Sequence, residues 1–243
     1  MHRDCRHAGG SKIKEIMKIG IIIAMDEEYG RMLEVLGGSP EGRIGGNEVV
    51  LWQCGIGKVN AAVGTMRLIQ EHRPDCILST GLAGGIDAGL RVMDVVVGSQ
   101  TAYHDVDCGM GNAPGQVQGL PERFAAHPAL LRAAAAAAKD CAMRVHEGLM
   151  CTGDQFITDR GRQAAIKAMH ADALVCEMES AAIAQTCHLM QVPFLSIRVV
   201  SDTPGNTDDH ARQWSEFLAS MTDRSFRFVL QFLNSLPDVL PDY

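Results

Sequence analysis

Residues 17–28 read Met-Lys-Ile-Gly-Ile-Ile-Ile-Ala-Met-Asp-Glu-Glu. The apolar, largely β-branched run from Ile19 to Ala24 predicts a buried strand. The three acids that follow predict the first turn of a helix, because carboxylates favour the positive end of a helix dipole. A buried strand that leads directly into a helix is typical of an α/β fold.

The same alternation continues along the chain. We predict further strands at Val49–Cys54, Cys76–Ser79, Val95–Val97, Leu149–Thr152 and Phe194–Val200. Apolar residues at three- and four-residue spacing predict helices at Glu27–Leu36, Val59–Glu71, Ala129–Lys139, Glu179–Met190 and Ala211–Leu233. This order predicts an α/β fold with a central mixed, twisted β-sheet flanked by helices on both faces.

Length and composition limit the classes of protein. The 243 residues fit one α/β domain or two smaller ones, and we expect a single domain over residues 17–243. Residues 1–16 lack the apolar stretch of a secretory signal, and we expect them to be disordered. The net charge of −7, without a basic cluster, argues against a nucleic-acid partner. The apolar runs are too short for a membrane span.

Cysteine and histidine spacing gives no metal-binding pattern. The eight cysteines form no C-x-x-C pair, and the nine histidines form no H-E-x-x-H motif. We therefore predict no metal, and reduced thiols in a cytoplasmic protein.

Glycines follow two of the predicted strands. Gly55-Ile56-Gly57-Lys58 resembles a phosphate-binding loop, but the spacing of a P-loop is incomplete because Val59 follows the lysine. The second run, Thr80 to Gly85, is predicted to be a turn. Both runs are also explained by tight turns and close backbone approach alone.

Three carboxylates also lie at predicted strand or helix ends, and each has a structural explanation. Glu28 fits a helix first turn, Glu179 fits a solvated helix acid, and Asp202 fits a turn. Taken singly, none of them identifies a reaction.

Six motifs in order resemble a known family. They are Met17 to Glu28, Gly55 to Val59, Tyr103-His104-Asp105, Gly153 to Ile157, Glu177-Met178-Glu179 and Arg198 to Asp202. Together they resemble the 5′-methylthioadenosine/S-adenosylhomocysteine nucleosidases of the nucleoside phosphorylase superfamily, over Met17 to about Leu233. The resemblance implies hydrolysis of the bond between adenine and the sugar of a 5′-substituted adenosine, without a cofactor.

The resemblance also implies roles for single residues. Glu28 matches the base that activates water, and Asp202 matches the acid that protonates N7 of adenine. Other positions match residues that bind the nucleoside, namely Gly84, Phe156, Ile157, Glu177, Met178, Glu179, Arg198, Ser201 and Trp214. Among them, Glu179 and the Met178 backbone hold ribose hydroxyls, Phe156 stacks on adenine, the Ile157 backbone binds its Watson–Crick edge, and Trp214 belongs to a lid.

Two departures from the family bear on the reaction and the substrate. Phosphorylases of the superfamily bind phosphate through arginines and a serine, whereas residues 79–82 contain no arginine and Leu82 occupies the serine position. Water is therefore the expected nucleophile. Residues 109–115 replace the aromatic residues that cover the 5′ group.

Several alternatives and an assembly remain to be tested. The alternatives are a nucleosidase for another purine nucleoside of the 6-amino-6-deoxyfutalosine type, a purine nucleoside phosphorylase, and a non-catalytic nucleoside-binding protein. The resemblance also implies a homodimer in which the loop near Tyr103 completes the pocket of the partner.

Overall fold

The computed structural model describes residues 16–109, 111–203, 216–217, 223–237 and 239–241. The predicted lid residue Trp214 lies outside these ranges. So do residues 1–15, which belong to the segment with predicted disorder, and the beginning of the helix predicted at Ala211. The start of the domain at residue 17 stays a prediction.

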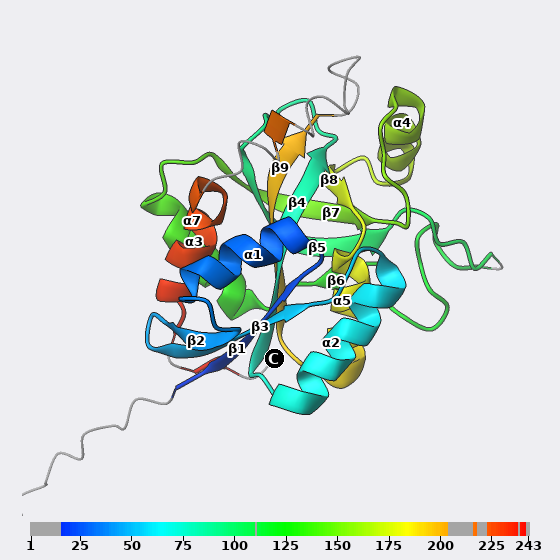
Figure 1. Cartoon of the computed structure of the whole chain (residues 1–243). Helices are drawn as coiled ribbons and strands as arrows, with labels where there is room; N and C mark the ends of the chain where they lie inside the picture. Colours follow the sequence, from blue (N-terminus) through cyan, green and yellow to red (C-terminus); the bar gives the residue numbers. More distant parts are fainter. Residues whose placement is uncertain (1–15, 110, 204–215, 218–222, 238, 242–243) are drawn as a thin grey trace, which may run out of the picture.

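The centre of the fold is a mixed sheet, as predicted (Figure 1). Its strands are β1 Lys18–Ile23, β2 Glu41–Ile44, β3 Asn47–Gln53, β4 Cys76–Gly85, β5 Val95–Tyr103, β6 Phe124–Ala125, β7 Val145–Thr152, β8 Ala173–Glu177 and β9 Phe194–Asp202. The order along the sheet is β2-β3-β1-β4-β8-β7-β5-β6. Strand β1 runs parallel to both β3 and β4, whereas β8 is antiparallel to β4.

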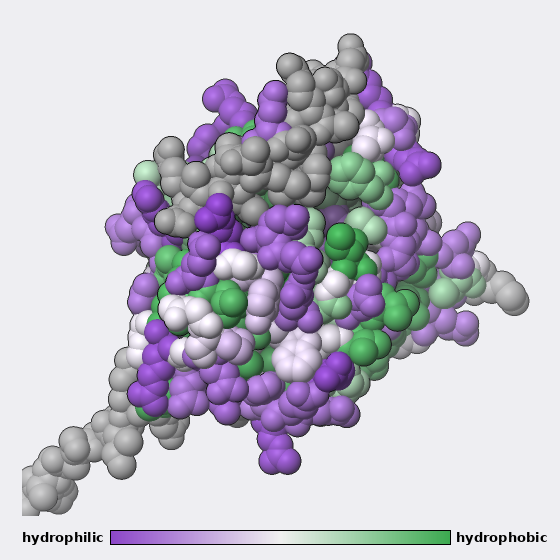
Figure 2. Space-filling model, in the orientation of Figure 1, coloured by the Kyte–Doolittle hydropathy of each residue, from purple (hydrophilic) through white to green (hydrophobic). Residues whose placement is uncertain are grey.

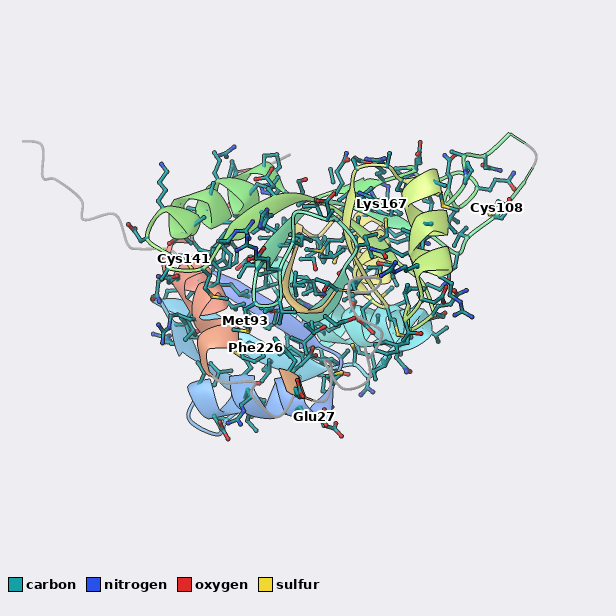
Figure 3. All side chains as sticks on the ribbon, turned by 90° about the horizontal axis from the view of Figure 1, so that it is seen from above. Glu27, Met93, Cys108, Cys141, Lys167 and Phe226 are labelled. Carbon is teal, nitrogen blue, oxygen red and sulfur yellow. The ribbon has the colours of Figure 1, made fainter. Side chains whose placement is uncertain are left out.

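Part of this sheet closes on itself. Strand β9 pairs with β4 on one side, in parallel, and with β5 on the other, in antiparallel. Strands β4, β8, β7, β5 and β9 therefore form a closed ring, seen from above in Figure 3. The closure brings the ends of strands that are distant in sequence to one side of the molecule.

Helices cover both faces of the sheet, as predicted. They are α1 Asp26–Val35, α2 Lys58–His72, α3 Pro128–Lys139, α4 Arg160–Met169, α5 Ser180–Met190 and α7 Asp223–Asn234. Helices α1, α3 and α7 pack on one face, with Phe228 and Phe232 fully buried, and α2 and α5 pack on the other (Figure 1). In the described chain, no helix is long and apolar enough to span a membrane.

The structure corrects several predicted boundaries. The glycine-rich run Thr80 to Gly85 is not a turn, because it continues β4 to Gly85. Strand β5 extends beyond Val97 to Tyr103, and β7 begins earlier than predicted, at Val145. Strands β2, β6 and β8 and helix α4 were not predicted.

Candidate active site

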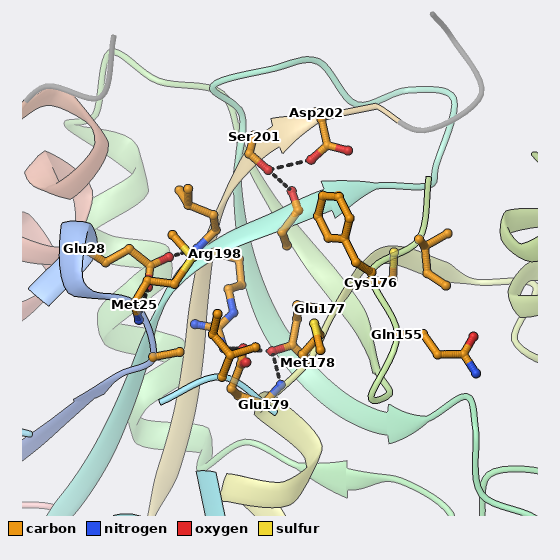
Figure 4. Close-up of a pocket in the computed structure, with 17 residues that line it drawn as sticks. Met25, Glu28, Gln155, Cys176, Glu177, Met178, Glu179, Arg198, Ser201 and Asp202 are labelled. Carbon is orange, nitrogen blue, oxygen red and sulfur yellow. Dashed lines mark hydrogen bonds and ion pairs between the residues drawn. The ribbon is translucent and has the colours of Figure 1, made fainter. Parts of the chain in front are cut away.

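A pocket opens beside the start of α1, where β8 and β9 end (Figure 4). All the predicted site residues in the described ranges line it, namely Glu28, Gly84, Phe156, Ile157, Glu177, Met178, Glu179, Arg198, Ser201 and Asp202. They come from α1, β4, β8, β9, the loop that follows β7 and the short link between β8 and α5. The fold therefore brings together residues that are up to 174 positions apart in the sequence, from Glu28 to Asp202.

Glu28 lies in the first turn of α1 and is almost completely buried. One carboxylate oxygen accepts a hydrogen bond from the Leu82 backbone N–H at 2.8 Å, and the other accepts from the Met25 N–H at 3.3 Å. Burial raises the pKa of Glu28, although the charge of Arg198 opposes the shift. The two interpretations of Glu28, as a residue that caps a helix and as a catalytic residue, are therefore compatible. Its side chain caps α1 and also lines the pocket.

Leu82 lines the pocket, and its backbone contacts a predicted catalytic residue. Its N–H holds Glu28, whereas its side chain is buried and belongs to the main apolar core. The departure from serine at this position consequently leaves the hydrogen bond to Glu28 in place.

Arg198 and Glu177 form a buried ion pair. Nη2 of Arg198 lies 2.8 Å from Glu177 Oε2, and both side chains are almost inaccessible to solvent. Glu177 also accepts hydrogen bonds from Thr152 and from the backbone N–H of Glu179 and Ser180. Burial alone would raise the pKa of Glu177, but Arg198 and these donors hold the pKa below its usual range. Glu177 is therefore the permanent counter-ion of Arg198.

Glu179 has a different electrostatic environment. Its Oε1 accepts a hydrogen bond from the Gly57 N–H at 3.0 Å, and its Oε2 lies 3.8 Å from Arg198 Nη2. Burial, together with the charge of Glu177, raises the pKa of Glu179 to about 7, although Arg198 lowers it. Near neutral pH both the protonated and the ionised form of this carboxyl group are therefore populated.

Asp202 reaches the pocket through a β-bulge. Ala83 pairs with Val200, but the next residue, Gly84, pairs with Asp202, so that Ser201 is the extra residue of β9. Adjacent residues of a regular strand point to opposite faces, whereas a bulge re-aims a side chain, which explains how Ser201 and Asp202 both line the pocket. The Ser201 hydroxyl lies 2.6 Å from Asp202 Oδ1 (Figure 4).

A glycine inside β4 permits the close approach of the charged groups. A Cβ atom at Gly81 would lie 2.8 Å from Glu28 Oε1 and 3.0 Å from Arg198 Nη1. We expect Gly81→Ala to lower the free energy of unfolding by about 1–3 kcal/mol, the usual effect of overpacking. Denaturant unfolding measures this. Gly30→Ala in α1 is the control, since nothing lies within 4 Å of the added atom, and an equal loss in both variants would contradict the explanation.

Sequence reasoning missed seven residues of the pocket. They are Ala24, Met25, Ile56, Leu82, Ala83, Gln155 and Cys176. Most of them adjoin residues that were predicted, so their place in the sequence was a usable signal. Apart from the polar Gln155, their side chains are small or apolar and carry no chemical pattern. Among the described residues, no three His, Cys, Asp or Glu side chains are arranged to hold a metal ion.

Comparison with known proteins identifies the family. The family described as the phosphorylase superfamily matches residues 18–234. The 5′-methylthioadenosine/S-adenosylhomocysteine nucleosidase of Actinobacillus succinogenes is 40% identical over 235 residues, which cover 90% of this chain and 100% of the relative.

Solved structures agree with this comparison. The nucleosidase of the same name from Colwellia psychrerythraea, solved in complex with adenine, has a TM-score of 0.87 and 36% identity, and covers 93% of this chain and 98% of its own. Futalosine hydrolase of Helicobacter pylori has a TM-score of 0.83 at 26% identity, and covers 91% and 99%. Because the matches extend over most of both chains, this chain belongs to the 5′-methylthioadenosine/S-adenosylhomocysteine nucleosidases of the phosphorylase superfamily.

Proposed function

We propose that the protein hydrolyses the N-glycosidic bond of 5′-methylthioadenosine, S-adenosylhomocysteine and 5′-deoxyadenosine, and that Glu28 and Asp202 catalyse the reaction. The products are adenine and the 5′-substituted ribose. One observation carries the proposal. Carboxylates from α1, β8 and β9 line a single pocket in a chain of the nucleosidase family.

The two catalytic carboxyl groups act on opposite sides of the scissile bond. The Glu28 carboxylate takes a proton from water, and the water oxygen bonds to the anomeric carbon of the sugar. The bond from this carbon to N9 breaks, and its electron pair moves into the adenine ring. Asp202 gives its proton to N7, so that adenine leaves as a neutral molecule. General acid–base steps of this kind each contribute about 10²- to 10⁴-fold in rate.

The remaining residues bind the nucleoside. The Glu179 carboxylate accepts hydrogen bonds from the ribose hydroxyls, and the Met178 backbone also binds a sugar hydroxyl. The buried ion pair of Arg198 and Glu177 holds this part of the pocket in place. Phe156, whose side chain is half exposed, stacks on adenine, and the Ile157 backbone binds its edge. Gly84 and Ser201 line the part of the pocket that binds adenine. Trp214, which lies outside the described residues, is proposed as part of the lid.

Charge favours water over phosphate as the nucleophile. Among the described residues that line the pocket, Arg198 is the one cation, whereas four carboxyl groups, those of Glu28, Glu177, Glu179 and Asp202, also line it. A pocket with this excess of acids repels a phosphate dianion. This argues against the phosphorylase alternative.

A substrate panel tests the function and its rivals. Purified protein is incubated with methylthioadenosine, S-adenosylhomocysteine, 5′-deoxyadenosine and 6-amino-6-deoxyfutalosine, each with and without phosphate, and the free base is measured by chromatography. We expect adenine without phosphate, and a reducing sugar as co-product. Strict dependence on phosphate, with a sugar 1-phosphate, would establish a phosphorylase. Preference for the futalosine substrate is the second candidate, favoured by the similarity to futalosine hydrolase. Binding without turnover would indicate a nucleoside-binding protein.

The ionisation of Glu179 makes nucleoside binding dependent on pH. Since the pKa of Glu179 is about 7, and the ionised form is the better acceptor for ribose hydroxyls, binding should tighten by about tenfold between about pH 6 and about pH 8. Calorimetry with an adenosine analogue that has a carbon–carbon glycosidic bond measures this. In Glu179→Gln the affinity for this analogue should be lower than in the wild type, and it should no longer change with pH.

The same pKa has the opposite consequence for stability. A folded-state pKa raised above the usual value of 4.5 means that the folded chain retains a proton that the unfolded chain releases, so this contribution to stability decreases as pH rises from about 4.5 to about 7. Glu179→Gln should therefore unfold at a higher temperature than the wild type at about pH 8, and this gain should shrink at about pH 5. A pH-independent difference would contradict the proposed titration of Glu179.

We also propose a homodimer. Val59 and Val63 lie four residues apart on α2 and are 73% and 54% exposed, and Ile56, in the turn before this helix, is 51% exposed. Apolar residues gather on the surface here (Figure 2). Ile56 also lines the pocket, and Cys108 marks a loop that projects from the body of the molecule (Figure 3). An exposed apolar face next to an active site is typical of a subunit interface. The loop after Tyr103 is proposed to reach the pocket of the partner.

A charged substitution tests this interface. Val59→Glu places a carboxylate at the centre of the exposed face, and we expect a monomer by light scattering, with adenine release reduced by about tenfold or more because the partner's loop is lost. Val239→Glu, at another exposed apolar residue, is the matched control and should stay dimeric. A wild-type chain that is active as a monomer would remove the proposal.

The cellular setting is proposed from the chemistry. The seven cysteines in the described ranges are free thiols, which is typical of a reducing compartment. The thiols support a cytoplasmic location, and the proposed release of adenine from methylthioadenosine supports a role in nucleoside catabolism and methionine salvage.

A further inference from the structure

The Gly55 to Lys58 turn resembles a phosphate loop in sequence but binds carboxylates in the structure. Lys58 is the first residue of α2, and its Nζ lies 2.7 Å and 2.8 Å from the two carboxylate oxygens of Asp105. Asp154 Oδ2 is 3.8 Å from the same nitrogen. The ammonium group is therefore already paired with acids of the protein, which leaves the phosphate-loop explanation without support.

Lys58, Asp105 and Asp154 are connected pairwise. The Lys58 backbone N–H donates to Asp154 Oδ1 at 2.8 Å, and the Asp154 N–H donates to Asp105 Oδ2 at 2.8 Å. The side chains of Lys58 and Asp105 are only 22% and 13% exposed, so solvent screens their attraction incompletely. The three residues come from the start of α2, the segment after β5 and the loop after β7. They tie these three segments together.

The same turn also holds the proposed ribose carboxylate. The Gly57 N–H donates to Glu179 Oε1 at 3.0 Å. Gly57 has φ of +95°, and a Cβ atom there would lie 3.0 Å from Asp154 Oδ1, so a larger residue would strain the backbone and press on the loop. Two successive N–H groups thus fix Glu179 and Asp154 relative to each other.

The loop after β7 depends on this support. Residues 153–159 form neither helix nor strand, yet Phe156 and Ile157 in this loop line the pocket. Asp154 lies two residues before Phe156. Gly153 allows the loop to pack against His104 and Asp105, because a Cβ atom there would collide with the His104 ring and lie 3.0 Å from Asp105 Cγ.

We propose that Lys58, Asp105 and Asp154 form a positioning cluster that fixes the base-binding loop, residues 153–157, at the correct distance from the ribose-binding Glu179. Lys58 is then a positioning residue for nucleoside recognition and binds no phosphate. The inference rests on the proposed roles of Phe156, Ile157 and Glu179. Disrupting the cluster weakens the binding of adenine and of the nucleoside more than it slows the chemical step, because none of its members lines the pocket that holds the proposed catalytic residues.

The test compares binding with turnover in variants of the full chain. Lys58→Met should raise the KM for methylthioadenosine and the Kd for adenine, measured by calorimetry, by about tenfold, which corresponds to about 1.4 kcal/mol. The kcat should change by less than about threefold. Lys58→Arg keeps the charge and should restore most of the affinity. The double variant Lys58→Met/Asp105→Asn should bind adenine no more weakly than the weaker single variant, because the two residues act as one unit.

Further variants separate positioning from general stability. Gly153→Ala leaves every charge in place but displaces the loop, and it should reproduce the increase in KM. The matched control is Arg123→Met, which breaks the two hydrogen bonds of 2.6 Å and 3.0 Å to Asp172, outside the pocket. It should lower the unfolding temperature and leave KM unchanged.

Three results would overturn the positioning role. The first is that Lys58→Met binds adenine as tightly as the wild type. The second is that the losses of adenine affinity caused by Lys58→Met and Asp105→Asn multiply in the double variant. The third is that Lys58→Met changes the molar mass of the protein in solution, which would assign the cluster to subunit assembly. A wild-type protein that releases no adenine from any nucleoside would instead refute the proposed function. The two failures are therefore distinguishable.

Discussion

Glu28→Gln should lower kcat for methylthioadenosine by at least about 10²- to 10⁴-fold, the usual contribution of a general base. The amide has nearly the same shape as the carboxyl group but cannot take a proton from water. Its oxygen can still accept the hydrogen bond from the Leu82 N–H, whereas its NH₂ group cannot accept the second one, from Met25. Initial rates of adenine release measure the effect, with circular dichroism as a check that the variant folds.

Glu27→Gln is the matched control. Glu27 is the neighbouring acid in the same helical turn and is exposed, so this variant should retain nearly the full rate. If Glu28→Gln also retained it, the base would have to be sought elsewhere.

The pH dependence of the rate gives a second test of Glu28. Because burial raises the pKa of Glu28 above that of an exposed glutamate, the active carboxylate is lost as pH falls through a range above the ordinary glutamate value. The kcat of the wild type, measured at saturating nucleoside so that the pH-dependent binding through Glu179 does not enter, should therefore decrease on the acidic side, and this decrease should be absent from the residual kcat of Glu28→Gln.

The sequence allowed the layered fold and the first strand and helix to be predicted, because local patterns control them. The run Ile19 to Ile23 is buried on both faces of the sheet, and such runs are recognisable without tertiary information. Helix α4 was missed because Ile166 is the one residue of this helix that is buried. A helix with a single buried position shows no clear apolar stripe in the sequence. Strand β2 is an edge strand of four residues, Glu-Gly-Arg-Ile, in which Ile44 is the one large apolar residue, so it gives little pattern.

The incorrect turn at Thr80 to Gly85 has a different cause. Glycine usually marks a turn, but here Gly81 lies in a strand so that Glu28 and Arg198 can approach the backbone. The requirement comes from groups far away in the sequence. Local glycine patterns cannot distinguish a turn from such a contact.

The candidate site depended on non-local information in the same way. Each carboxylate had an ordinary structural explanation by itself, and only the ordered resemblance brought Glu28, Glu179 and Asp202 together. The closure of β9 onto both β4 and β5, and the bulge at Ser201, place them in one pocket. Neither feature has a signature in the local sequence, since each depends on which strands become neighbours.

Asp202→Asn should lower kcat for methylthioadenosine by about 10²- to 10⁴-fold, for a reason that differs from that of Glu28→Gln. The asparagine has no acidic proton for N7, so adenine would have to leave as an anion. Ser201→Ala is a milder variant, because it removes only the hydroxyl 2.6 Å from Asp202 Oδ1. It should slow the reaction by about tenfold, the effect of losing one hydrogen bond to the carboxylate that forms as Asp202 gives up its proton.

The leaving group distinguishes the two catalytic carboxyl groups. A 5-methylthioriboside of 4-nitrophenol releases an anion that is stable at neutral pH, so its departure needs no proton from the enzyme. On this substrate Asp202→Asn should recover most of the wild-type rate, because water attack by way of Glu28 is intact, whereas Glu28→Gln should stay slow on both substrates. Release of nitrophenolate is followed by absorbance. Equal losses for Asp202→Asn on both substrates would show that Asp202 orients the sugar or the water, and the assignment of this residue as the general acid would have to be withdrawn.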